Sequence, residues 1–281
     1  WNKEMEPSDY EDIKNKPRPG HADYTASVRY GGFNDYRGGG RFSGRITVAL
    51  VMAGALAKKL LSLFKVEVLA YTKAIGNIEI EETPSIEEIR KAYSNAVRCP
   101  DLEKAKLMEK AILKAKKEGD SLGGMVECIV LNVPAGVGDP IFDSLDADIA
   151  KMIFNVPAVK GVEFGVGFKA AVLKGSENND QYAIKDGKII TLSNNAGGIL
   201  GGLSTGMPIV VRAAIKPTPS ISKKQKTVDL SKMEETTIQV KGRHDPCIVP
   251  KAVPAIESAV AITLVDHMIR AGIIPKVIGR K

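Results

Sequence analysis

The chain has 281 residues, of which 44% are hydrophobic and 26% are charged, the proportions of an ordinary globular protein. These values exclude collagenous, disulfide-rich and wholly disordered classes, and because no Ser/Pro-rich linker divides the chain we expect a single domain over residues 1–281. Forty basic against 33 acidic residues give a formal net charge of +7, which favours anionic partners.

The first elements follow from glycine, proline and apolar patterning. Residues 1–44 are rich in glycine and proline and are predicted to be a loop. Residues 45–64 have a helical pattern, and the stretch 48–57 is apolar all round, which predicts a helix buried on most sides. Residues 66–80 are rich in β-branched side chains and predict one or two strands.

The rest of the chain mixes predicted strands and helices. Helices are expected after Pro84, after Pro100, at 145–154 and at 253–271. Strands are expected at 125–133, 159–168 and 208–215, and the segments between them include a glycine-rich loop at 193–202 and a polar excursion at 222–237. Because the two most apolar helices need cover on more than one side, a helical layer between two sheets is predicted.

Apolar runs and cysteines indicate the compartment. The longest unbroken apolar run, 48–57, is shorter than the roughly 20 residues that a membrane helix needs, and the polar start lacks a signal-peptide pattern. Cys99, Cys128 and Cys247 form no CxxC pair, which favours a reducing compartment over a disulfide framework or a zinc site. We therefore expect no membrane segment, no metal and a cytoplasmic location.

Two segments are candidates for binding an anion. Residues 37–45 combine four glycines with three arginines directly before a predicted helix, so backbone amides, a helix N-terminus and guanidinium groups can all face a phosphate. The segment is neither a P-loop nor a GxGxxG dinucleotide motif. Residues 216–220 (KPTPS) follow a predicted strand and offer Lys, Thr and Ser donors, although the two prolines also fit a plain stiff turn.

The sequence has three histidines, two of which are candidates for proton transfer. His21 lies in a predicted loop close to arginines, where it is either a proton donor near working pH or an ordinary surface histidine. His244 and Asp245 precede Pro246, which holds Asp245 extended, and the alternative is a turn in which the aspartate bonds locally. His267 lies on a predicted helix and is interpreted as a packing or surface residue.

Five segments together resemble the chorismate synthase family, of the archaeal kind. The matching segments, in chain order, are 18–25 (RPGHADYT), 38–45 (GGGRFSGR), 195–202 (NAGGILGG), 216–220 (KPTPS) and 242–247 (GRHDPC). Each is weak by itself, but five in the right order over most of the chain make the resemblance specific.

The resemblance implies a lyase that depends on reduced FMN. Members of the family convert 5-enolpyruvylshikimate-3-phosphate into chorismate by 1,4-elimination of phosphate, the last common step of the shikimate pathway to aromatic amino acids. It also implies an α+β fold, a β-α-β sandwich with a helical layer between two largely antiparallel sheets, assembled as a homotetramer. No nucleic acid is expected as a partner, and the alternative function is a non-catalytic phosphate- or RNA-binding module. Whether the protein also reduces its own flavin stays open.

The resemblance also implies roles for individual residues. His21 matches the histidine that protonates the reduced flavin near N1, Asp245 matches the aspartate that relays a proton from flavin N5, and Ser43 matches a serine of the active-site shell. Arg45 is expected to bind anionic groups of the substrate. The expected FMN contacts are Arg41, Phe42, Ser43, Gly201, Lys216, Pro217, Thr218, Pro219, Ser220 and Arg243.

The chain departs from the family pattern in two ways. Phe42, Gly44 and Ile46 stand where the family commonly has serine, alanine and glutamate, so any contact from Phe42 must come from its backbone or ring. The family's N-terminal segment, which carries a second histidine and arginines for the substrate phosphate, has no counterpart in residues 1–13. We therefore expect a truncated chain in which FMN binding persists but turnover is impaired.

Overall fold

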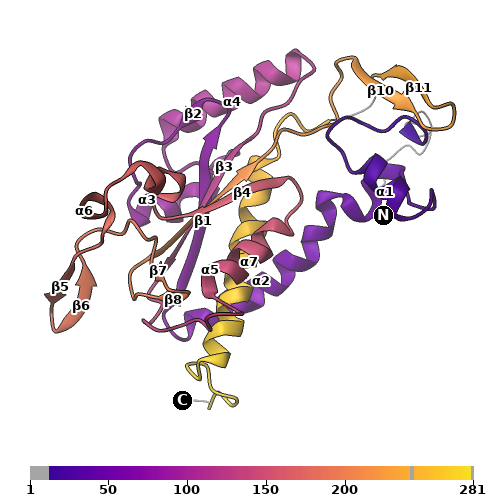
Figure 1. Cartoon of the computed structure of the whole chain (residues 1–281). Coiled ribbons are helices and arrows are strands. Elements are labelled where there is room, and N and C mark those ends of the chain that lie inside the picture. Colours follow the sequence, from indigo (N-terminus) through magenta and orange to yellow (C-terminus); the bar gives the residue numbers. More distant parts are fainter. Residues whose placement is uncertain (1–12, 241–243, 280–281) are drawn as a thin grey trace.

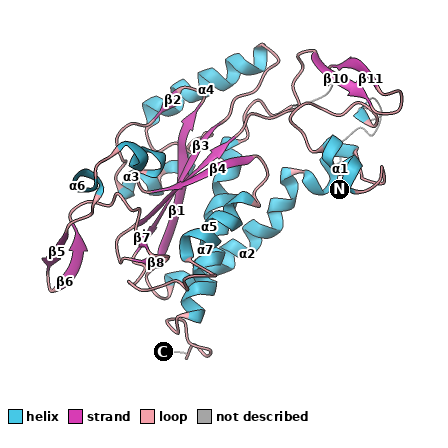
Figure 2. Ribbon diagram, in the orientation of Figure 1, coloured by secondary structure: helices cyan, strands magenta, loops and turns pink. Residues whose placement is uncertain are grey.

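A five-stranded antiparallel sheet forms the centre of the computed structural model, which describes residues 13–240 and 244–279. Its strands stand in the order β2 (Ile78–Glu79), β1 (Glu67–Ile75), β3 (Gly124–Leu131), β9 (Ile209–Ile215) and β4 (Val159–Phe164) (Figure 2). Every neighbouring pair is antiparallel. The predicted strands at 66–80, 125–133, 159–168 and 208–215 are thus all present in one sheet.

Three helices lie on one side of this sheet (Figure 1). The longest, α7 (Val249–Arg270), packs against β1 and β3, and α2 (Thr47–Ser62) and α5 (Leu145–Phe154) pack against α7. By length and composition α7 could span a membrane, but 72% of its most apolar stretch is buried inside the structure. It is therefore the central helix of the hydrophobic core.

Helix α2 is less buried than its composition predicts. It meets α7 through Gly54, where a Cβ atom would lie 2.2 Å from the Cβ of Ser258, so the two backbones approach closely. The opposite face of α2 exposes Val48, Met52 and Leu56, each with more than 60% of its surface accessible. The prediction that this helix is buried on most sides is wrong for the described residues, because α7 covers only one of its faces.

A row of polar side chains crosses the sheet on consecutive strands. Tyr71, Glu127, Arg212 and Glu163 are direct cross-strand neighbours on β1, β3, β9 and β4. The Tyr71 hydroxyl donates to Glu127, and Arg212 donates to Glu127 and to Glu163 at 2.7 Å each. The side chain of Glu127 is only 4% exposed, so the charge of Arg212 is what makes this buried carboxylate tolerable.

A small lobe, made of residues 13–43 and 225–240, stands apart from the sheet (Figure 1). It contains α1 (Asp23–Arg29), the 3-10 helix η2 (Arg37–Phe42) and the hairpin of β10 (Gln225–Asp229) and β11 (Glu234–Ile238). The Thr227 hydroxyl donates to the carbonyl of Pro17, which ties the two halves of the lobe together. The prediction of a loop over residues 1–44 is therefore wrong at α1 and η2, and residues 1–12 lie outside the described part.

Short elements surround the sheet. On the way from η2 to α2 the chain forms η3 (Gly44–Ile46). The segment between β2 and β3 forms α3 (Ile86–Arg90), η4 (Ala92–Ser94) and α4 (Leu102–Lys117), with Asp101 capping α4. The segment between β4 and β9 forms η5 (Gly167–Val172), α6 (Gly175–Asn178), β5 (Tyr182–Lys185), β6 (Lys188–Thr191), β7 (Ile199–Leu200) and β8 (Leu203–Ser204).

Candidate active site

His21 belongs to a compact cluster of charged side chains in the small lobe. Its Nδ1 atom lies 2.6 Å from Oδ1 of Asp23. Arg18 donates to the same carboxylate from Nε at 2.7 Å, from Nη2 at 2.8 Å and from its backbone amide at 3.0 Å. Their side chains are 6% (Arg18), 11% (Asp23) and 16% (His21) exposed, so the surface-histidine interpretation does not hold.

Asp23 is the electrostatic centre of this cluster. Burial by itself would raise the pKa of its carboxyl group, but the hydrogen bonds and charges of Arg18 and His21 lower that pKa well below the ordinary value. Asp23 is therefore a carboxylate at neutral pH.

The segment that follows β9 comes directly against the His21 loop. Lys216 donates through Nζ to the carbonyl of Gly20, and Nη1 of Arg18 donates to the Ser220 hydroxyl at 3.0 Å. The carbonyl of Thr218 accepts from the Ser121 hydroxyl at 2.7 Å, which fixes the segment to the start of β3. Two segments about 200 positions apart in the sequence, 18–25 and 216–220, are thus in contact, as their shared resemblance to one binding site requires.

The glycine-rich segment before α2 lies on the other side of His21. At Gly39, which has φ +82°, a Cβ atom would lie 3.3 Å from Nε2 of His21 and 3.8 Å from the Cβ of Ser43. Glycine is therefore what lets the imidazole approach this backbone. The Ser43 hydroxyl accepts from the backbone amide and from Nη1 of Arg45, at 3.3 and 3.2 Å. Two of the five matching segments thus meet at the His21 ring, and a third, 216–220, contacts the loop that carries it.

Arg41 and Phe42 lie on the exposed side of the same segment. Nη1 of Arg41 donates to the Tyr30 hydroxyl at 3.2 Å. The ring of Phe42 is tilted by 52° against that of Tyr30, with 6.5 Å between the centroids. Phe42 therefore contributes an aromatic surface at the position where the family commonly has a serine hydroxyl.

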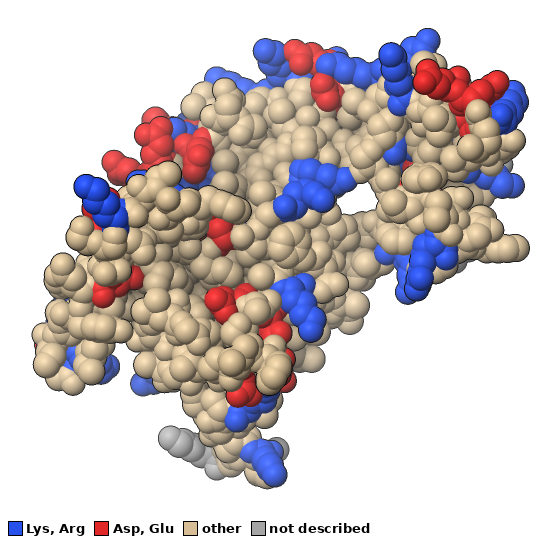
Figure 3. All heavy atoms as spheres, in the orientation of Figure 1, with Lys and Arg blue, Asp and Glu red and all other residues tan. Residues whose placement is uncertain are grey.

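A cavity of about 230 Å³ opens beside this cluster, lined by residues 19–20, 120–121, 216–219, Ile221 and Gln225. Two buried polar atoms in its lining, Oγ1 of Thr218 and Nε2 of Gln225, have no hydrogen-bond partner within the chain. Unsatisfied donors beside a lysine suit a phosphate or a polar ligand chain. Figure 3 shows an opening between the small lobe and the body of the molecule, with basic side chains on both sides of it.

The segment 244–247 approaches the same end of the sheet without touching His21. The carbonyl of Pro246 accepts from the backbone amide of Leu122, next to the Ser121 that holds Thr218. Asp245 forms an ion pair with Lys251 at 2.7 Å, and Nε2 of His244 bonds the Val240 carbonyl at 2.9 Å. Asp245 thus has a local partner, and Arg243 lies outside the described residues.

Gly201 is not brought to this cluster. It occupies the turn between β7 and β8, at φ +60°. The adjacent Gly202 packs against Ser144 at the start of α5. Figure 1 shows β7 and β8 at the end of the sheet away from the small lobe. Of the expected FMN contacts that the structure describes, Gly201 is the one that stands apart within a single chain.

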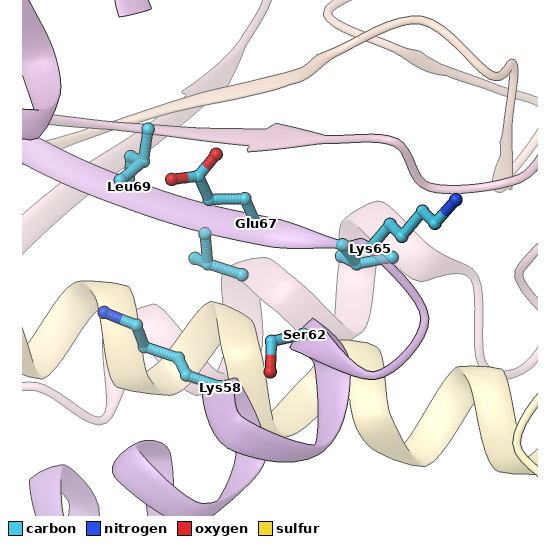
Figure 4. A pocket seen from close by; sticks show the side chains of 7 residues that line it. Lys58, Ser62, Lys65, Glu67 and Leu69 are labelled. Atoms are coloured by element: carbon cyan, nitrogen blue, oxygen red, sulfur yellow. The ribbon is translucent and has the colours of Figure 1, made fainter. Parts of the chain in front are cut away.

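A larger cavity, of about 310 Å³, lies elsewhere and contains none of the predicted site residues. Figure 4 shows its labelled side chains, which come from the end of α2 and the start of β1. Its most enclosed cation, Lys58, is ion-paired with Glu257 of α7. This cavity therefore offers no free charge for a phosphate at that lysine and is not our candidate site.

Arg18 and Asp23 are the functional candidates that the sequence reasoning left unassigned. Both stand in the 18–25 segment, Arg18 three positions before His21 and Asp23 two positions after it. The sequence itself indicates one of these contacts. Asp23 follows His21 by two positions, a spacing that lets its carboxylate bond the imidazole ring. The contact of Arg18 with Ser220 joins residues 202 positions apart, which no local pattern reveals.

Comparisons with known proteins identify the family of the chain. The family model described as chorismate synthase matches residues 1–269. A chorismate synthase of Dehalococcoides mccartyi (strain BAV1) is 56% identical over 279 residues, covering 99% of this chain and 76% of that protein. One from the archaeon Korarchaeum cryptofilum is 54% identical over 271 residues, covering 96% and 75%. The chain thus spans about three quarters of the length of these relatives.

A solved structure shares the fold. The structure titled "Crystal Structure of Chorismate Synthase" superimposes with a TM-score of 0.75 at 33% sequence identity, over 89% of this chain and 70% of that one. Sequence, fold and the meeting of the matching segments around His21 lead to one conclusion. The chain belongs to the chorismate synthase family, the lyases that form chorismate from 5-enolpyruvylshikimate-3-phosphate.

Proposed function

We propose that reduced FMN binds where the small lobe meets the end of the main sheet, held by residues 41–43, 216–220 and Arg243. The observation that carries this proposal is the contact of segments 18–25, 38–45 and 216–220 around His21. The cavity beside Lys216, with its unpartnered Thr218 and Gln225 atoms, suits the phosphate or ribityl end of the cofactor. When bound, reduced FMN supplies the electron density that helps the phosphate of the substrate leave.

Within this site we assign each remaining residue a role. His21 donates Nδ1–H to Asp23, which leaves Nε2 as the atom that exchanges a proton with the flavin. Arg45 binds anionic groups of the substrate, and Ser43 orients its guanidinium group through the 3.2 Å hydrogen bond. Asp245 relays a proton once its ion pair with Lys251 has broken. Ligand binding supplies the free energy that breaks this pair.

Flavin titration under anaerobic conditions tests this assignment. We expect saturable quenching of reduced FMN that excess RNA does not reverse, because a shaped cavity discriminates whereas a general basic surface does not. His21→Ala should retain FMN affinity and lower the rate of phosphate release by about 10² to 10⁴, the usual contribution of a general acid. Reversal by RNA, or an unchanged rate in His21→Ala, would contradict the proposal.

We also propose that a second sheet, which is not among the described residues, covers the outer face of α2 and completes the sandwich of the family as one domain. The support is the row of exposed apolar side chains Val48, Met52 and Leu56 on a helix whose inner face already packs against α7. Such a contiguous apolar face marks a packing surface. Leu56→Lys, which places a charge on that face, should lower the melting temperature of the protein if a sheet covers it and leave it unchanged if solvent does.

A homotetramer is the assembly that we propose. The hairpin of β5 and β6 projects from the body (Figure 1) and exposes Tyr182, Ile184 and Ile189, each by more than 60%. A second copy would cover this hairpin and bring its own Gly201 to the FMN site, which explains why Gly201 stands apart in one chain. Light scattering should report four copies, and a monomer that binds FMN with full affinity would contradict both statements.

A reducing cytoplasm is the location that we propose. Cys99, Cys128 and Cys247 are all free and buried. Burial raises the pKa of Cys99 and of Cys247 to about 11, so these thiols stay protonated and unreactive. A thiol titration of the denatured purified protein should find three free thiols, and any disulfide would count against this location.

A further inference from the structure

The Asp23 carboxylate is fixed in place by several hydrogen bonds from one arginine. Three donors of Arg18 converge on its two oxygens, and both side chains are almost fully buried. A forked guanidinium that meets a carboxylate on two atoms fixes direction as well as charge. Asp23 therefore has one available orientation, which is set by Arg18.

That orientation determines how His21 is presented. Oδ1 of Asp23 lies 2.6 Å from Nδ1 of His21, and a carboxylate only accepts hydrogen bonds, so Nδ1 carries the proton that joins them. Nη2 of Arg18 lies 3.1 and 3.3 Å from the two ring nitrogens. Because a guanidinium has no acceptor, it is a cation beside the ring and not the partner of Nδ1–H.

The other ring nitrogen lies against the glycine-rich segment before α2. Nε2 of His21 points to the backbone at Gly39, where the missing side chain leaves room for it. Arg18 extends the same network to Ser220, and Lys216 bonds the carbonyl next to His21. The network thus couples the direction of the imidazole to the segment that follows β9. The charged groups that contact the ring are Asp23 and Arg18, both in its own loop, and Lys216 of the segment after β9 bonds the neighbouring Gly20 carbonyl.

We propose that Asp23, clamped by Arg18, is a positioning residue that fixes His21 with Nδ1–H toward the carboxylate and Nε2 toward the flavin. Its catalytic value rests on the proposed function, in which His21 exchanges a proton with the cofactor. The clamp itself is a property of the chain alone. The two statements can therefore fail separately, and the experiments below distinguish them.

Nitrogen-15 spectra of the His21 ring test the clamp without any flavin. In the unmodified chain we expect the Nδ1–H form, and in Asp23→Asn a mixture of both ring tautomers, because an amide either donates or accepts at that position. Asp35→Asn is the matched control, since Asp35 also pairs with a nearby arginine, Nε of Arg37 at 2.9 Å, but not with His21. A predominant Nε2–H form in the unmodified chain, or an unchanged ring spectrum in Asp23→Asn, would overturn the proposal.

Kinetics test what the clamp does for the reaction. Asp23→Asn should lower kcat by about 10²-fold with little change in KM, the cost typical of a misplaced catalytic group. Asp23→Glu should recover part of that loss, because it restores the charge, and Asp35→Asn should have no effect. Equal losses in Asp23→Asn and Asp23→Glu, with native circular dichroism, would show a role in packing and overturn the positioning role. If His21→Ala retains full activity, the proposed function fails while the ring spectra still decide the clamp.

Discussion

Nδ1 of His21 lies 2.6 Å from Oδ1 of Asp23, and the same carboxylate receives the forked guanidinium of Arg18. One buried aspartate thus links a candidate proton donor to the segment after β9, through the bond from Arg18 to Ser220. Stability and chemistry depend on the same contact, so acid should affect both.

Asp23 should contribute stability that disappears in acid. Its folded-state pKa is depressed, so its contribution is complete above the unfolded-state pKa of about 3.9 and is lost as the pH falls below that value. Asp23→Asn should cost about 3 kcal/mol at pH 7, since it leaves Arg18 buried without its counter-charge. Urea unfolding at pH 7 and pH 3 checks this, and a difference between the two proteins that stays equal at both pH values would contradict it.

Gly39 should matter for chemistry more than for stability. Gly39 and Gly32 have nearly the same φ, +82° and +83°, but a Cβ at Gly39 meets His21 while one at Gly32 meets nothing within 4 Å. Alanine at either position should cost about 1 to 2 kcal/mol of backbone strain. Only Gly39→Ala should also lower kcat, and equal activities of the two variants would show that the His21 contact is unimportant.

Because α2 and α7 approach closely at Gly54, any side chain at this position should destabilise the protein. A Cβ there would lie 2.7 Å from the Cα of Ser258, which is backbone and has no room to move. Gly54→Ala should destabilise the protein by about 1 to 3 kcal/mol, in spite of the better helix propensity of alanine. Gly44→Ala, where nothing lies within 4 Å, is the control for thermal unfolding, and equal melting temperatures would refute the close packing.

Loss of Arg212 from the polar row across the sheet should lower the stability of the fold. Burial, reinforced by the charge of Glu127, raises the pKa of Tyr71 well above its ordinary value, so its hydroxyl stays a donor. Arg212→Gln should cost about 3 to 5 kcal/mol, because Glu127 is then a buried charge without a cation. Arg90→Gln breaks an exposed ion pair with Glu67 and should cost much less than Arg212→Gln, because solvent screens exposed charges. Denaturant unfolding that ranks the two variants equally would contradict this.

The sequence predicts the core of the fold well because the core is built from strong periodic patterns. Runs of β-branched residues locate β1, β3, β4 and β9, and the predicted helix 145–154 coincides with α5. The pattern fails where short polar elements depend on tertiary contacts. Helix α1 lies among glycines and prolines, and the strands β10 and β11 are mostly polar and pair chiefly with each other. The apolar composition of α2 predicts that its faces pack against other elements. It does not predict which element packs against the face that is exposed here.

The sequence indicates which segments form the candidate site, but not how their side chains are arranged in space. His21, Ser43 and 216–220 are in one place, as the resemblance implies, because glycine and proline fix the local backbone of each segment. The Arg18–Asp23 clamp and the separation of Gly201 required the tertiary structure. Both depend on which distant segments touch, and local patterns carry no information about that.

The affinity of the chain for reduced FMN, with and without Lys216, tests the central claim that the cofactor binds at the junction of small lobe and sheet. Lys216→Ala should weaken FMN binding by about 10- to 100-fold, the loss expected for one charge-assisted hydrogen bond. Lys224→Ala removes an exposed lysine eight positions further along and should leave the affinity unchanged. Equal dissociation constants for the two variants would place the flavin elsewhere on the molecule.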